Sequence, residues 1–184
     1  MSMSIQVVSL KSPCFQEIRS LRKLYIGENP ADEERYQEVE NFRDSCSYHL
    51  AYLDGKKIVG AIRITPIGHG MSFVERMVDV RCYFEHPLDT FDANRLVLDG
   101  QYRGGKHLHN FLMQVSHWLM VNTNFRYISA VCRGNLASLY VAIGGQILAE
   151  NLNWQSREST RLYNLVSLDL EKVYYTIKGK MSNG

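Results

Sequence analysis

The chain has 184 residues, 45% of them hydrophobic and 22% charged, a mixture typical of one globular domain that buries its own core. A net charge of only +2 with scattered basic residues argues against a nucleic-acid-binding surface, and no apolar run approaches the roughly 18 residues of a membrane span. Because the four cysteines lie far apart and the histidines show no metal-ligand spacing, we expect reduced cysteines, no metal site and a cytoplasmic protein without a signal peptide.

The first part of the chain predicts a strand, two helices and a β-hairpin. Residues 5–10 have the composition of a short strand, and Pro13 opens a helix whose apolar residues follow helical spacing. A charged helix is predicted over 30–43, with Pro30 in its first turn. Two β-rich runs then flank the Asp-Gly pair at 54–55, which is the strongest short hairpin signal in the chain.

The rest of the chain alternates strands and helices. The predicted elements are a helix over 72–82, a strand over 91–98, a helix from about 105 to 121, a strand over 127–132, a helix over 135–145 and two antiparallel strands over 146–154 and 161–170. The strand–helix–strand part requires a crossover between parallel strands. We therefore expect one α/β domain over 1–175, with a mixed, mostly antiparallel twisted sheet and helices on both faces, followed by a flexible tail at 176–184.

A glycine-rich turn joins the strand over 91–98 to the helix that follows it. Asp99 ends the apolar strand, and Gly104 and Gly105 precede the next apolar run. The first N–H groups of a helix have no helical acceptor and can bind a phosphate, and glycine lets an anion approach closely. Glycine between a strand and a helix is also common in a plain turn. The turn by itself therefore leaves an anion site and a simple connection both open.

The same stretch resembles the acyl-donor motif of the GNAT superfamily of N-acyltransferases. Tyr102, Arg103 and Gly104 match the start of the family's Y-R-G-x-G-x-G/A turn, whereas Lys106 and Leu108 stand at the later glycines. The resemblance implies a GNAT-like fold and a turn that holds the phosphate of an acyl thioester. The donor-binding residues that it implies are Leu98, Arg103, Gly104, Gly105, Lys106 and His107.

A branch of that superfamily, the acyl-homoserine-lactone synthases and long-chain N-acyl amino acid synthases, is more similar still. Residues 60–64 give G-x-x-R-I where those synthases carry G-x-x-R-L, and residues 92–95 occupy the place of their E-x-S-R. Arg19 or Arg22 stands for the arginine of their R-x-x-x-F. That branch often takes acyl groups from acyl carrier protein, whose pantetheine arm presents one phosphate, which explains the missing glycines. The implied donor is acyl-CoA or acyl carrier protein, the second being a partner protein.

The resemblance also implies roles for individual side chains, each with a structural alternative. Asp92 takes the place of the general base, or is a solvated carboxylate at a strand end or an ion-pair partner of Arg95. Tyr140, in NLASLYVAIGGQIL, matches the tyrosine that protonates the leaving thiolate, or packs on the sheet. Arg22, Arg63 and Arg95 are assigned to the substrate's carboxylate, although a buried arginine is more often part of a structural ion pair.

The implied function is transfer of an acyl group from an acyl thioester to the amine of a small acceptor such as an amino acid, by direct attack with general-base help. The alternatives are a non-catalytic acyl- or carrier-binding module on the same fold and an ordinary acetyl-CoA-dependent N-acetyltransferase. A third alternative, a nucleotide-binding regulator, is disfavoured because the sequence lacks a Walker lysine pattern and a full Rossmann fingerprint. The long segment 66–90, with Met71 and Met77, is either a core helix or a lid over an acyl chain.

Overall fold

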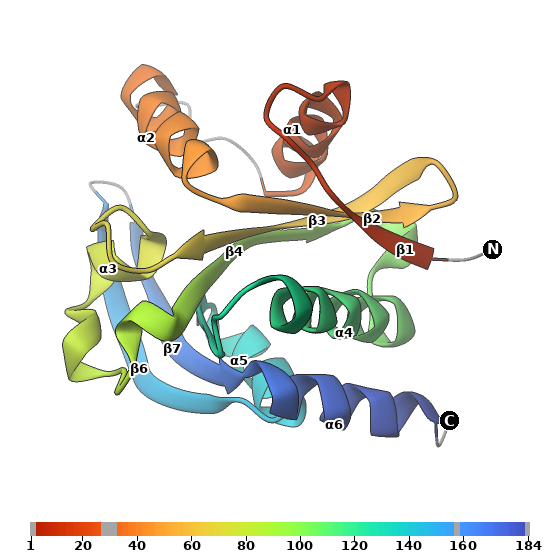
Figure 1. Cartoon of the computed structure of the whole chain (residues 1–184). Coiled ribbons are helices and arrows are strands. Elements are labelled where there is room, and N and C mark those ends of the chain that lie inside the picture. The colour runs from red at the N-terminus through yellow and green to blue at the C-terminus, as the bar shows by residue number, and fades with distance from the viewer. Residues whose placement is uncertain (1–2, 27–32, 157–158, 183–184) are drawn as a thin grey trace. The chain divides into compact units, whose positions relative to one another are not determined.

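A computed structural model describes residues 3–26, 33–156 and 159–182 (Figure 1). The helices are α1 (Pro13–Ile26), α2 (Glu33–Ser45), α3 (Phe73–Met77), α4 (Gly105–Asn122), α5 (Gly134–Ala142) and α6 (Leu170–Ser182). The strands are β1 (Met3–Val7), β2 (Tyr48–Asp54), β3 (Lys57–Pro66), β4 (Thr90–Leu98), β5 (Tyr127–Cys132), β6 (Gln146–Ser156) and β7 (Ser159–Asp169). Within the described residues, no helix is both long and apolar enough to cross a membrane.

The strands form a seven-stranded sheet in the order β1-β2-β3-β4-β5-β7-β6. The pairs β1–β2, β2–β3, β5–β7 and β6–β7 are antiparallel. β4 and β5 are parallel, with Thr90 beside Tyr127 and Asp92 beside Ser129, as the crossover through α4 requires. The expectation of a mixed, mostly antiparallel sheet is confirmed.

The chain divides into two compact units, which are described separately. Unit 1 comprises residues 1–65 and 94–115, and unit 2 comprises residues 66–93 and 116–184. β4 and α4 each run from one unit into the other. Each unit is therefore built from two separate segments of the sequence.

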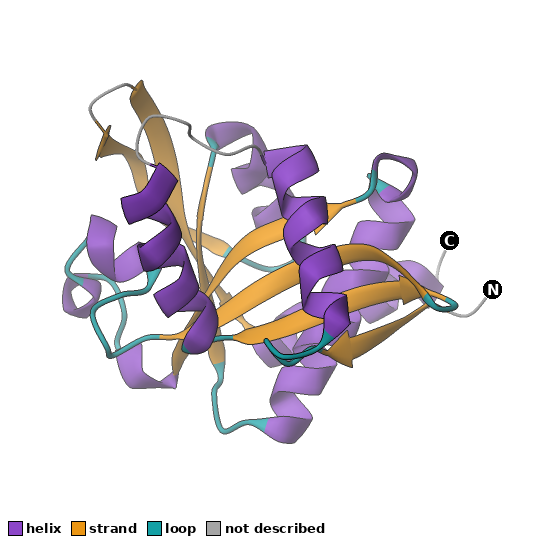
Figure 2. Ribbon diagram, turned by 90° about the horizontal axis from the view of Figure 1, so that it is seen from above, coloured by secondary structure: helices purple, strands orange, loops and turns teal. Residues whose placement is uncertain are grey.

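Unit 1 has helices on both faces of its strands. Phe15 and Ile18 of α1 pack in one core cluster with Ala51 of β2, whereas Phe111 of α4 stacks on Tyr52 with ring centroids 4.8 Å apart. Neighbouring residues of a strand point to opposite faces, so α1 and α4 cover opposite sides of β2. Figure 1 shows α1 and α2 on one side of β2 and β3, and Figure 2 shows these two helices from above, lying across the strands.

Unit 2 has a core of its own. Val74 of α3 packs with Ile67, Phe84 and Leu165, so the part of 66–90 around α3 is core, as the first interpretation of that segment holds. α5 and α6 pack on β7. The sequence pattern did not predict α6, whose buried residues are Leu170, Val173 and Ile177. The helix continues through the described part of the segment expected as a tail, 176–182.

Local sequence chemistry explains where several elements end. The hairpin is confirmed and closes at Gly55, whose φ is +61°. α3 stops at Met77 instead of continuing to 82, because Asp79 caps a separate 3-10 turn through the N–H of Arg81. Among the described residues α2 begins at Glu33. Pro30, which was predicted to lie in the first turn of this helix, is outside the described residues.

The turn that follows α5 requires glycine at position 145. Gly145 donates its N–H to the carbonyl oxygen of Tyr140 at 2.9 Å. A Cβ on Gly145 would lie 2.8 Å from that same oxygen and 3.1 Å from Leu168. Position 145 therefore accepts only glycine in this chain.

Candidate functional site

The glycine turn, residues 98–107, lies wholly in unit 1 and joins β4 to α4. The Asp99 carboxylate accepts the N–H of Gln101 at 3.2 Å and starts a single 3-10 turn. Gly104 has a φ of +104°, which glycine adopts without strain. A Cβ built on Gly104 or Gly105 would meet no described residue beyond its chain neighbours within 4 Å. The first turn of α4 therefore begins beside open space, with N–H groups that no helical carbonyl accepts.

The side chains predicted to bind the donor take different positions. Arg103 donates from Nε to the carbonyl oxygen of Leu98 at 3.2 Å, and its guanidinium carbon lies 4.4 Å from the centre of the Tyr25 ring. The His107 ring meets the Tyr102 ring edge-on at 5.1 Å. Lys106 is exposed. Arg103 thus braces the turn, and Lys106 is a cation at the helix start that a bound anion can reach.

The end of β4 is held tightly against β3. A Cβ on Gly60 would lie 2.5 Å from the Leu98 side chain and 3.0 Å from the carbonyl oxygen of Val97. The N–H of Asp99 donates to the carbonyl oxygen of Val59 at 2.8 Å. The glycine of the G-x-x-R-I pattern is therefore required by this close approach of two backbones.

A buried ionic cluster centres on Glu40 of α2. Its carboxylate accepts hydrogen bonds from Arg43 at 2.8 Å, from Arg63 at 2.9 Å and from Arg95 at 3.1 Å. Arg63, on β3, is only 1% exposed, while the side chain of Arg95 is 21% exposed. The structure therefore brings Arg63 and Arg95 together through the carboxylate of Glu40, as the structural ion-pair alternative expects, and their role toward a substrate stays a prediction.

A second carboxylate, that of Asp44, completes the cluster one helical turn later. It accepts from Arg63 at 2.9 Å and from Arg22 of α1 at 3.2 Å. Burial lowers the pKa of Arg22 to about 10, although the Asp44 carboxylate opposes the change, so Arg22 keeps its charge at neutral pH. All three predicted arginines therefore belong to one cluster. Glu40 and Asp44 show one signal in the sequence, a four-residue spacing that places them on one helix face.

The backbone of β4 is strained at Arg95, the least buried arginine of the three predicted ones. Its φ is +54°, a left-handed conformation that is uncommon for residues other than glycine. Asn94 beside it accepts from Nε of Arg63 and donates to Thr65 at 3.4 Å. The hydrogen bonds of Asn94 and the ion pair of Arg95 with Glu40 therefore hold this local conformation against its intrinsic cost.

His49 lies inside the same cluster and is neutral. Its Nε2 donates to the carbonyl oxygen of Asp44 at 3.0 Å, and its Nδ1 accepts from Arg22 at 3.1 Å. Burial is the main cause that lowers the pKa of His49 to about 4, and the Arg22 cation adds to it. A histidine of the unfolded chain has a pKa of about 6.5. The folded protein therefore excludes a proton that the unfolded chain binds between these values.

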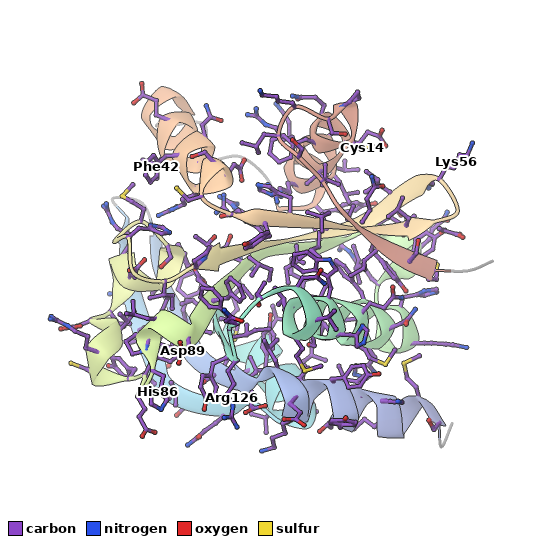
Figure 3. The ribbon with its side chains drawn as sticks, in the orientation of Figure 1. Cys14, Phe42, Lys56, His86, Asp89 and Arg126 are labelled. Carbon is purple, nitrogen blue, oxygen red and sulfur yellow. The ribbon has the colours of Figure 1, made fainter. Side chains whose placement is uncertain are left out.

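This difference predicts a pH-dependent loss of stability. As the pH falls from about 6.5 towards 4, the unfolded chain gains a proton at His49 and the free energy of unfolding decreases. We expect His49→Asn to flatten this decrease in urea unfolding measured at pH 7, 6 and 5. His86→Asn, at an exposed histidine before β4 (Figure 3), is the matched control. Parallel pH dependence in wild type and His49→Asn would contradict the assignment.

Asp92, in unit 2, is buried on β4 and faces the start of α3. Its Oδ2 accepts the backbone N–H groups of Phe73 at 2.6 Å and Val74 at 3.2 Å. The residue is 0% exposed, so the alternative of a solvated strand-end carboxylate is wrong. The carboxylate that Arg95 binds at 3.1 Å is Glu40. Asp92 therefore holds the first turn of α3 in place, and its role as a base stays a prediction.

Tyr140 lies on α5 in unit 2, where the residue is half-buried. Burial is the main cause that raises the pKa of its hydroxyl, and the nearby Cys132 adds to it. The hydroxyl therefore keeps its proton at neutral pH, but the raised pKa also makes it a weaker acid, and its role as the proton donor stays a prediction. Burial also raises the pKa of Cys132 to about 11, so this thiol is not a nucleophile at neutral pH. Among the described residues, no group of three His, Cys, Asp or Glu side chains is placed to hold a metal ion.

No family model and no curated protein matches the chain by sequence, but solved structures match its fold. The CoA-dependent acyl-homoserine lactone synthase BjaI, solved with SAM and isopentyl-CoA, has a TM-score of 0.68 at 14% identity. The match covers 98% of this chain and 90% of the BjaI chain. FeeM, an N-acyl amino acid synthase from uncultured soil microbes, has a TM-score of 0.63 at 8% identity. The match covers 92% of this chain and 93% of the FeeM chain.

A spermidine N-acetyltransferase chimera of SpeG from Vibrio cholerae and hSSAT matches over a similar length. Its TM-score is 0.65 at 11% identity, and the match covers 94% of this chain and 98% of that one. Likeness at such low identity establishes the fold. The chain has the GNAT fold, and the resemblance to acetyltransferases and acyl synthases seen in the sequence is confirmed at that level.

Proposed function

We propose that the protein is an N-acyltransferase that moves an acyl group from an acyl thioester, carried by CoA or acyl carrier protein, to the amine of a small acceptor. The observation that carries this proposal is the glycine turn. On this fold it presents Gly104, Gly105 and the exposed Lys106 to open space at the start of an 18-residue helix. Free N–H groups and a cation suit the phosphate of the donor's pantetheine arm.

The arginine cluster supports an acceptor that carries a carboxylate. Among the described side chains it holds four guanidinium groups, on Arg22, Arg43, Arg63 and Arg95, against the carboxylates of Glu40 and Asp44. Nε of Arg22 is buried and has no hydrogen-bond acceptor among the described residues. Arg95 is the member that solvent reaches best, so we assign the acceptor's carboxylate to it. An amino acid is such an acceptor.

The proposed reaction is a direct transfer. The acceptor nitrogen attacks the thioester carbonyl carbon, the N–C bond forms, and the C–S bond breaks as the thiolate leaves. Asp92 takes the proton of the amine, directly or through a water, and the hydroxyl of Tyr140 returns a proton to the thiolate. No acyl-enzyme is formed in this scheme.

The test is turnover with defined donors. The protein is incubated with acyl-CoAs and acyl carrier proteins of short and long acyl chain together with pooled amino acids, and free thiol and N-acyl product are measured. Thiol release with one donor class identifies the donor and supports the proposal. Donor binding without release indicates a non-catalytic acyl-binding module. Neither binding nor release means that the glycine turn is only a connection.

Gly104→Ala separates the turn's role from general destabilisation. Alanine at a φ of +104° is strained by about 1–3 kcal/mol, so we expect the donor KM to rise roughly tenfold with little change in the acceptor KM. Gly70→Ala is the matched control, because Gly70 also has a positive φ, +74°, and open space around it. Equal donor KM values for both variants would remove the turn from donor binding.

A further inference from the structure

The shape of the glycine turn depends on a tyrosine from a distant part of unit 1. The N–H of Gly100 donates to the hydroxyl oxygen of Tyr25 on α1 at 3.0 Å, across 75 positions of the sequence. The guanidinium of Arg103 lies over the same ring at 4.4 Å. One side chain thus holds the first and last residues of the segment 100–103, through a hydrogen bond and a cation–π contact.

A second contact holds the middle of the segment from the hairpin. The hydroxyl of Tyr102 donates to Oδ2 of Asp54 at 2.7 Å, across 48 positions. The other carboxylate oxygen of Asp54 is buried and has no hydrogen-bond partner among the described residues. A buried acceptor without a donor costs stability, and the hydrogen bond of Oδ2 to Tyr102 offsets part of that cost. The Tyr102 ring in turn meets the His107 ring edge-on, so the contact with Asp54 also reaches the first turn of α4.

Neither Tyr25 nor Asp54 belongs to the predicted donor-binding residues. Both contact the turn whose backbone carries those donor-binding residues. A turn already fixed in its binding shape loses less conformational freedom when an anion binds its N–H groups. If the hydroxyl of Tyr25 is removed, the N–H of Gly100 loses its acceptor. The turn then samples other conformations, and donor affinity falls while the acceptor's site keeps its residues.

We propose that Tyr25 and Asp54 are positioning residues that preorganise the glycine turn for the phosphate of the acyl donor, a proposal that rests on the proposed function. Tyr25 acts through the N–H of Gly100 and Asp54 through the hydroxyl of Tyr102. Both contacts act on the same short turn, residues 100–103, so the effects of losing them are expected to be coupled.

The test uses Tyr25→Phe, which removes one hydroxyl and keeps the ring beneath Arg103. Tyr175→Phe, at a tyrosine of α6 that is 59% exposed, is the matched control. Loss of one hydrogen bond predicts a donor KM roughly three- to tenfold higher for Tyr25→Phe, with acceptor KM and melting temperature close to those of the control. Tyr102→Phe is expected to act similarly, and the double variant more strongly. Hydrogen–deuterium exchange of the peptide over 98–108 should quicken in each.

The donor is the acyl-CoA or acyl carrier protein that gives thiol release with wild type. If Tyr25→Phe and Tyr175→Phe share the same donor KM and the same exchange over 98–108, the positioning role is overturned while wild-type activity stands. A uniform loss of kcat and stability without a selective change in donor KM also overturns it. Wild-type protein that neither binds a donor nor releases thiol overturns the proposed function itself, and the positioning role with it.

Discussion

Asp92→Asn is expected to lower kcat for acyl transfer by about 10²–10⁴-fold, the usual contribution of a general base. The asparagine amide oxygen can still accept the N–H groups of Phe73 and Val74 that the carboxylate binds. The substitution therefore removes the negative charge and the basic oxygen but keeps most of the support of α3. We expect the free energy of unfolding to fall by only about 1–2 kcal/mol, the difference between a charged and a neutral acceptor.

The measurement compares kcat, donor KM and urea unfolding for Asp92→Asn and for Asp89→Asn. Asp89 lies three positions earlier and its side chain is exposed (Figure 3). Asp89→Asn therefore removes a carboxylate that is close in sequence but does not support α3. A kcat near the wild-type value together with a clear loss of stability would mean that Asp92 only fixes the backbone at α3. The base would then have to be another group.

Glu40→Gln is expected to have the largest effect on stability, lowering the free energy of unfolding by about 3–5 kcal/mol. The neutral amide cannot balance the guanidinium groups of Arg43, Arg63 and Arg95 that meet at this carboxylate. Arg63 is 1% exposed and cannot turn to water. Its remaining carboxylate, Asp44, already serves Arg22. Repulsion among buried cations is therefore added to the loss of the ion pairs.

Glu38→Gln is the control for this prediction, because Glu38 lies on the same helix with an exposed side chain. Its loss should change the free energy of unfolding by less than about 1 kcal/mol, as for other exposed carboxylates. Thermal and urea unfolding of both variants measure the difference. Similar stabilities would show that Glu40 is not the centre of the cluster.

The glycine turn was predictable because its signals are local. Gly104 and Gly105 follow an apolar strand and precede an amphipathic helix, and both neighbours are visible within a short stretch of sequence. The hairpin at 54–55 was predictable for the same reason. The helix α6 was missed because its buried residues are only Leu170, Val173 and Ile177 among many polar ones, and the pattern is too sparse to stand out beside a polar terminus.

The partners of the predicted polar residues were not predictable. Arg63 and Arg95 were singled out, but Glu40 lies 23 and 55 positions away from them. Asp92 was assigned from a motif, and its binding to the backbone of α3 follows from the path of the chain through 66–74. No spacing rule joins residues at such separations.

The sequence by itself determined the order of most strands and helices, the parallel crossover through α4 and the position of the glycine turn, because periodicity and turn chemistry act between near neighbours. Only the tertiary structure decided which carboxylates neutralise the buried arginines, why position 60 must be glycine, and that Tyr25 and Asp54 hold the turn. These features depend on groups that meet across the folded unit, and for the arginine cluster burial makes the ion pairs obligatory. Such contacts form only when segments distant in the sequence pack together, so no short stretch of sequence predicts them.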